Sequence, residues 1–224
     1  MSLLKSFPAL TLVFISLYGC QNNTRTVQNT DSVSKEISGD NILDTGKTNV
    51  KNTPDSTNTT PGDKYLLVLT SNAIQLVDRQ TGSSKEINFG IPLTQMIELT
   101  GNVLEVKPSS VVINQECGAG SLQMASWSNG LTLVFKQTSN QKEWKFAGWY
   151  MGKSPRTSKT LTTMAGIGIG STRAEMESAY VIEVSKTTLG HEFSTSSGLY
   201  GIFDGSGKDA KISGLWSGVS CNFR

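Results

Sequence analysis

The chain has 224 residues and a formal net charge of +2, which allows one or two modest domains. Acidic and basic residues are mixed along it, and no basic run with interleaved aromatic residues occurs, so the sequence argues against a nucleic-acid partner. Hydrophobic residues make up only 37% of the chain, and the shortage is concentrated in residues 21–62, which contain no aromatic side chain.

The first twenty residues are typical of an export signal. Lys5 precedes an apolar run over residues 7–18, which is too short for a permanent membrane helix but suits the core of a signal peptide. The run ends in Leu17-Tyr18-Gly19-Cys20, which resembles the lipobox of bacterial lipoproteins, although Tyr18 is bulkier than the family usually has there. The resemblance implies removal of residues 1–19 and acylation of Cys20. The alternative is an ordinary secretory leader with an incidental cysteine.

Residues 20–62 are predicted to form the lipidated N-terminus and a disordered tether, since their polar composition cannot bury enough apolar surface to offset the ordering entropy. Residues 63–224 are then the exported domain, with possible halves 63–152 and 153–224. The anchor implies a location in the cell envelope. In a two-membrane envelope, Gln21 after the lipidated cysteine resembles the sorting pattern of outer-membrane lipoproteins that face the periplasm.

Cys117 and Cys221 remain as an even pair in an oxidising compartment, and we expect a disulfide between them. A metal centre is a poor alternative, because two thiols and the single histidine, His191, fall short of the four ligands of a structural zinc site. The sequence therefore predicts no metal and no cofactor.

Periodicity and turn residues predict an α+β domain with antiparallel strands and short helices. One helix begins near Leu93 and ends at Gly101, and a second lies within 166–180, where Thr172 and Glu175 form a capping box. Asn129-Gly130 is a strong hairpin signal. The expected strands are 65–71, 73–78, 85–90, 124–128, 131–135, 144–152, 181–185, 198–203 and 210–216.

The two halves of the domain resemble each other. A methionine follows a glycine by six residues in both, at Gly90 and Met96 and at Gly170 and Met176, and KFAGWYMG matches KISGLWSG, which we aligned through Trp149 and Trp216. This pattern indicates a tandem repeat of one helix plus an antiparallel sheet. A chance match between two amphipathic units is the alternative.

The segment from Ile169 to Glu175 resembles a helix start found in two families. One comprises the outer-membrane assembly lipoproteins of the SmpA/OmlA type, and the other has the beta-lactamase-inhibitor-protein fold, which repeats a helical segment and an antiparallel sheet in tandem. Members usually carry methionine where Ser171 stands, and they have a second helix for which this sequence shows no clear pattern. The resemblance implies the fold and assigns no binding residue.

Three further motifs are better explained by turns than by chemistry. Gly166, Gly168 and Gly170 precede a helix but lack the lysine of a phosphate-binding P-loop. The Ser-x-x-Lys pattern from Ser139 to Lys142 lacks the companion motifs of penicillin-binding enzymes. Residues 204–209, with Asp204 and Asp209, offer too few carboxylates for calcium.

A catalytic His191, beside Glu192, would need a nucleophile and an orienting partner that the sequence does not single out, so we assign no catalytic residue. The sequence predicts a lipid-anchored, non-enzymatic domain that binds another envelope protein or a wall component. The alternatives are an envelope hydrolase that uses His191 and an inhibitor of a periplasmic enzyme.

Overall fold

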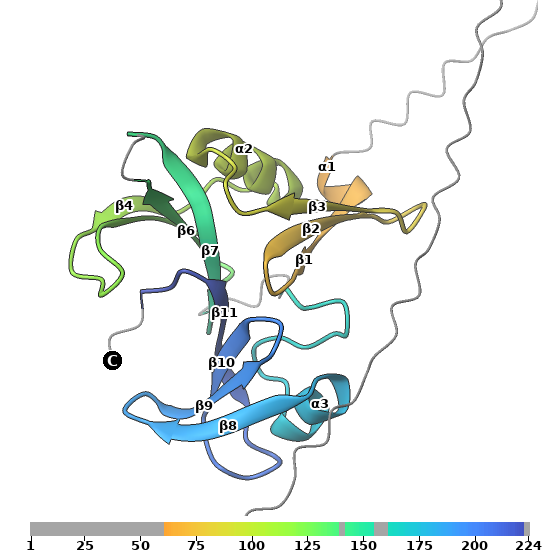
Figure 1. Ribbon diagram of the computed structural model, residues 1–224. Coiled ribbons are helices and arrows are strands. Elements are labelled where there is room, and N and C mark those ends of the chain that lie inside the picture. The colour runs from red at the N-terminus through yellow and green to blue at the C-terminus, as the bar shows by residue number, and fades with distance from the viewer. Residues whose placement is uncertain (1–60, 139–141, 155–160, 222–224) are drawn as a thin grey trace, which may run out of the picture. The chain divides into compact units, whose positions relative to one another are not determined.

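The computed structural model describes residues 61–138, 142–154 and 161–221 (Figure 1). The predicted signal peptide, Cys20 and almost all of the tether lie outside the described residues. The last two residues assigned to the tether, 61 and 62, belong to the helix α1, Pro61–Lys64. Gly62 is buried there because it packs closely on Glu105, whose Cδ would lie 2.6 Å from a Cβ at this position.

Two antiparallel sheets and a few short helices confirm the predicted α+β class. The smaller sheet has the order β1-β2-β3, with β1 Tyr65–Leu69, β2 Ala73–Asp78 and β3 Ser84–Asn88. The larger sheet has eight strands in the order β4-β5-β6-β7-β11-β10-β9-β8. Its strands are β4 Ser110–Asn114, β5 Leu122–Ser126, β6 Leu131–Gln137, β7 Trp144–Gly152, β8 Ile182–Thr187, β9 Gly190–Thr195, β10 Leu199–Phe203 and β11 Ile212–Gly218.

The first predicted helix is longer than expected. α2 spans Leu93–Leu104 and passes through Gly101, which we had taken as its end. The C-cap of the helix is Glu105, which adopts the left-handed conformation (φ 57°) that glycine usually occupies at this position. The N–H of Val106 donates to the Gly101 carbonyl at 3.2 Å. The helix can continue because it places two more apolar side chains, Val103 and Leu104, against the core.

The second helix begins where the sequence predicted. α3 spans Arg173–Ala179, Thr172 is its N-cap, and Glu175 completes the capping box. None of the helices in the described ranges is long and apolar enough to cross a membrane.

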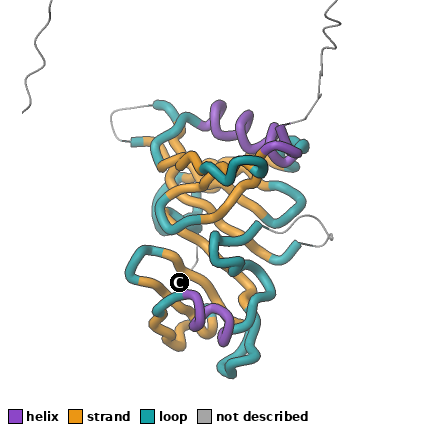
Figure 2. The backbone as a smooth tube through the Cα atoms, turned by 90° about the vertical axis from the view of Figure 1, so that its right-hand side faces the viewer, coloured by secondary structure: helices purple, strands orange, loops and turns teal. Residues whose placement is uncertain are grey.

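One face of the eight-stranded sheet, called here the core face, carries the main hydrophobic core. α2, α3 and the three-stranded sheet all contribute to this core, and Figure 2 shows α2 and α3 at opposite ends of it. Met96 and Met176 are both fully buried in it. The indole of Trp149 donates from Nε1 to the Thr70 carbonyl at 2.9 Å, so the two sheets are also joined by a hydrogen bond.

The two halves of the large sheet have the same construction. Each is one helix followed by four antiparallel strands, and the strand order is symmetric about the central β7–β11 pair. Gly90 donates its N–H to the Phe146 carbonyl before α2, and Gly170 donates in the same way to Ile212 before α3. The strands β1–β3 have no counterpart among the described residues of the second half. The halves are therefore structural repeats that share one sheet.

The strand registers correct our alignment of the tryptophans. The register shifts once between β6 and β7 and once, at the equivalent place, between β10 and β11. With these bulges matched, Tyr150 is equivalent to Trp216, and Trp149 is equivalent to Leu215. Our pairing of Trp149 with Trp216 was wrong by one residue, and a one-residue slip in a strand exchanges its two faces.

Candidate functional site

The second face of the eight-stranded sheet, called here the outer face, points away from the core. Side chains alternate between the faces of a strand, and directly opposed residues share a face, so the registers assign its residues. Figure 1 shows the helices and the three-stranded sheet on the other side. The outer face holds Ser110, Val112, Met124, Ser126, Thr132, Tyr150, Trp216, Tyr200, Ile202, Glu192, Ser194, Glu183 and Ser185.

Three aromatic side chains form a row across the middle of the outer face. Tyr150 on β7, Trp216 on β11 and Tyr200 on β10 are directly opposed neighbours. The Trp216 ring centroid lies 6.5 Å from that of Tyr150 and 6.2 Å from that of Tyr200, with interplanar angles of 29° and 16°. Trp216 is only 3% exposed, whereas Tyr200 is 37% exposed, so the row has a buried centre and an accessible end.

Glycines allow the Tyr150 ring to lie close to the backbone. Gly152 and Gly214 are directly opposed on β7 and β11. A Cβ on Gly152 would lie 2.9 Å from the ring, and one on Gly214 would lie 3.2 Å from the phenol oxygen. Burial raises the pKa of Tyr150 above its usual range. The row is thus held in place by the sheet beneath it.

A disulfide closes one end of the outer face. The Cα atoms of Cys117 and Cys221 lie 5.2 Å apart, and their sulfurs are bonded, as the sequence predicted. The pair packs with Leu122 and Val134 in a small second cluster. It therefore ties the loop between β4 and β5 to the segment that follows β11.

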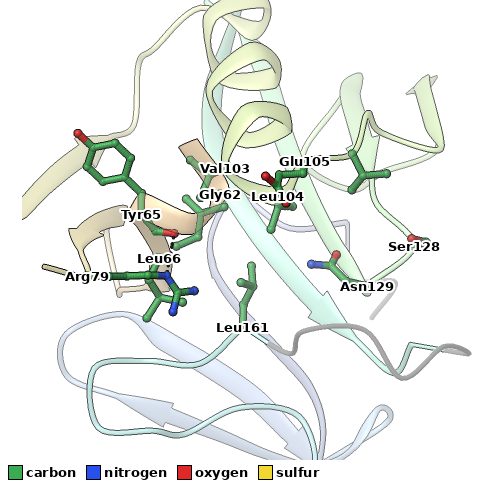
Figure 3. Close-up of a pocket in the computed structure, with 12 residues that line it drawn as sticks. Gly62, Tyr65, Leu66, Arg79, Val103, Leu104, Glu105, Ser128, Asn129 and Leu161 are labelled. Carbon is green, nitrogen blue, oxygen red and sulfur yellow. Dashed lines mark hydrogen bonds between the residues drawn. The ribbon is translucent and has the colours of Figure 1, made fainter. Parts of the chain in front are cut away.

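A separate cavity of about 300 Å³ lies between β1, the end of α2 and the turn before β6 (Figure 3). Its walls include Leu67, Leu104 and Leu161, and Arg79 extends toward it. The Arg79 Nε donates to the Tyr65 carbonyl at 3.4 Å. This cavity could not be predicted from the sequence, because its walls come from segments far apart in the chain.

The structure does not assemble a catalytic group around His191. This residue lies on β9, opposite Lys186 and Phe203, on the core face of the sheet. It does not line the cavity of Figure 3. Within the described ranges, no serine or carboxylate is hydrogen-bonded to it.

The other motifs serve as turns. The N–H groups of Gly166, Gly168 and Gly170 already donate to protein oxygens, those of the Thr163 carbonyl, the Ser171 hydroxyl and the Ile212 carbonyl, so they form no anion-binding cradle. The Asp204 carboxylate accepts from the Lys211 N–H at 2.7 Å. Ser139 lies outside the described residues. Where the structure describes side chains, no three metal-ligating groups cluster.

No family model, curated protein or solved structure matches this chain. The outer face is therefore assigned as the candidate functional site from its geometry alone. Its aromatic row is held in place by the sheet, and accessible apolar and acidic residues lie on either side of the row. Sequence inspection missed it, because the row depends on strand register.

Proposed function

We propose that this chain is a lipid-anchored envelope lipoprotein whose exported domain binds another envelope protein through the outer face. The aromatic row is the observation that carries the proposal. Tyr200 is the accessible end of this row, and tyrosine contributes strongly to the binding energy of protein interfaces, because it buries a large area and loses little side-chain entropy.

The row is suited to binding because it is already ordered. Tyr200 is accessible and stacks on the buried Trp216, so its ring needs no rearrangement before it meets a partner. Exposed Glu183 lies in the same row of directly opposed residues as Tyr200, beyond Ser194, and supplies a negative charge at that side of the outer face. A complementary partner would present an apolar patch with a basic group at its rim.

A protein partner is favoured over a glycan of the cell wall. Sugar rings bind proteins by stacking on a free aromatic face. Trp216, the largest ring of the row, stacks with a tyrosine on each of its two neighbouring strands and is almost fully covered. It therefore offers no free face to a sugar, and one face of the accessible Tyr200 ring is already stacked on it.

The anchor completes the proposal. Acylation of Cys20 would hold the domain at a membrane, and a flexible chain of about 40 residues has an r.m.s. reach of roughly 35 Å. The outer membrane, facing the periplasm, is the location we propose from Gln21. The resemblance of residues 169–175 to lipoproteins of outer-membrane assembly agrees with this location and is part of the proposal.

Site-specific photocrosslinking tests this function. We would place a photoreactive phenylalanine at Tyr200 of the full chain in the cells to which it is native, and the same residue at Met164 as a control. Met164 is 66% exposed and belongs to no strand of the sheet. We expect a discrete protein adduct from position 200 alone. Adducts of equal yield from both positions, or none from position 200, would contradict the proposal.

A further inference from the structure

The two edge strands of the large sheet occupy equivalent positions in the two halves but differ in chemistry. β4 and β8 are the outermost strands, and among the described residues each pairs with one neighbour only. A free strand edge exposes a row of backbone N–H and C=O groups that can pair with another strand. Proteins usually protect such an edge with charged side chains or proline.

The edge of β8 is protected by charge and the edge of β4 is not. Glu183 and Lys186 lie on β8, one on each face of the sheet. The repeat places Ser110 and Ile113 of β4 at the equivalent positions. β4, with the sequence SVVIN, contains no charge, no proline and no glycine.

β4 also exposes apolar side chains on both faces. Val111, Val112 and Ile113 have exposed fractions of 41%, 54% and 53%. All three are β-branched, which favours strand pairing. A partner strand would cover these side chains and satisfy the free backbone groups in one step.

We propose that β4 is a self-association edge, through which two copies of this chain pair in antiparallel orientation. A two-fold axis at Val112 would place this residue opposite its own copy on the outer face. Val111 would then face Ile113 of the partner subunit, and Ser110 would face Asn114 of the partner subunit. This inference goes beyond the proposed function and does not depend on it.

The second copy is the occupant that the strand itself favours. In this register every apolar residue meets another β-branched residue, the hydroxyl of Ser110 meets an amide, and no like charges meet. β8 is less suited to pair in this way, because Glu183 and Lys186 lie on opposite faces, could not neutralise each other, and would have to give up hydration at the new contact. A five-residue strand pair buries little surface, so we expect a weak dimer that confinement at a membrane would promote.

Cysteine crosslinking of the full chain tests both the contact and its register. Directly opposed Cα atoms in an antiparallel pair lie about 4.5–5.5 Å apart, within the range of a disulfide. We therefore expect Val112→Cys to give a disulfide-linked dimer in membranes under mild oxidation. Ser110→Cys would lie opposite Asn114 of the partner subunit and should not crosslink. Ser185→Cys, the β8 equivalent of Val112, should not crosslink either.

A charge variant provides the second measurement. Adding Ser110→Glu and Ile113→Lys to the Val112→Cys chain gives β4 the charges of β8, and it should abolish the crosslink while the melting temperature stays unchanged. The proposal is overturned if Val112→Cys remains monomeric or if the charged variant crosslinks equally well. Equal crosslinking of Ser110→Cys, or a Val112→Cys adduct with a different protein, would also overturn it.

Discussion

Tyr150 and Trp216 are equivalent residues of the two structural repeats, and they lie directly opposite each other at the centre of the sheet. Their rings stack with centroids 6.5 Å apart. β7 and β11 are the last strands of their halves, so this stack joins the two repeats on the outer face. Tyr200 extends it by one more ring. The same residues that unite the halves thus form the candidate binding surface.

Trp216 and Tyr200 should have separable roles. Trp216→Ala removes a buried ring and thereby both of the stacking contacts that this ring makes. We expect it to lower the free energy of unfolding by about 3–5 kcal/mol. Tyr200→Ala should cost much less stability, because its ring is partly exposed, but the partner identified by photocrosslinking should no longer co-purify with this variant. Urea denaturation followed by circular dichroism measures the first effect. Equal losses of stability in the two variants would contradict this division.

A glycine in β10 should be intolerant of any side chain. A Cβ on Gly201 would lie 2.3 Å from the Phe193 ring and 2.6 Å from the Gly214 carbonyl oxygen. Gly201→Ala should therefore lower the free energy of unfolding by about 1–3 kcal/mol through overpacking. Gly118→Ala is the control, since no atom lies within 4 Å of its Cβ position.

The first half suggests how this loss could be repaired. It has Ala125 and Leu133 where the second half has Phe193 and Gly201, so the large and small residues exchange strands. Phe193→Ala combined with Gly201→Leu should be more stable than the sum of the two single changes predicts. Strict additivity of the unfolding free energies would argue against the repeat equivalence.

Local sequence signals predicted much of the fold. The Asn129-Gly130 hairpin forms, with Gly130 at a φ of 92° that favours glycine. The capping box at Thr172 and the Cys117–Cys221 pairing also formed as expected. Each of these depends on a few adjacent residues or on cysteine parity, which a single sequence displays directly.

Features that depend on register could not be predicted in this way. β4 and β9 carry no turn signal of the strength of Asn-Gly, and we missed both strands. We misaligned Trp149 with Trp216 because we matched the two residues by type. The bulges, which determine the face of the sheet on which each residue lies, cannot be read from the sequence. The aromatic row brings together residues from β7, β10 and β11, and only the strand order makes them neighbours.

The Cys117–Cys221 disulfide should contribute strongly to stability. It closes a loop with a sequence separation of 104, for which the chain-entropy model gives a stabilisation of about 4–5 kcal/mol. Reduction with dithiothreitol should lower the melting temperature while the far-ultraviolet circular dichroism spectrum at 25 °C stays unchanged. The Cys117→Ser and Cys221→Ser double variant should melt like the reduced protein and show no response to dithiothreitol. Two free thiols titrating in the unreduced native protein would contradict the pairing.

The mature chain should begin at Cys20. Intact mass spectrometry of protein extracted from membranes should show loss of residues 1–19 and a fatty-acid increment, and Cys20→Ser should accumulate as uncleaved precursor. Two acyl chains are needed because one chain alone binds a membrane only marginally. A mature N-terminus elsewhere, or the absence of the increment, would rule out the lipoprotein assignment.

The N-terminus of α3 should make stability depend on pH at the acidic end. The Glu175 carboxylate accepts from the Thr172 N–H at 2.7 Å and from the Thr172 hydroxyl at 2.9 Å, and these bonds hold the pKa of Glu175 below its usual range. A carboxyl whose pKa is lowered by folding adds stability above the pKa of the unfolded chain, about 4.3, and loses it as the pH falls through the folded value. Glu175→Gln should therefore lower the melting temperature at pH 7, and the difference from the wild type should shrink below about pH 4.

Thr172→Ala, which costs about 1 kcal/mol through loss of the cap, should reduce this pH dependence as well. A difference between wild type and Glu175→Gln that stays constant from pH 7 to pH 3 would show that the charged form of Glu175 is not what stabilises the helix start.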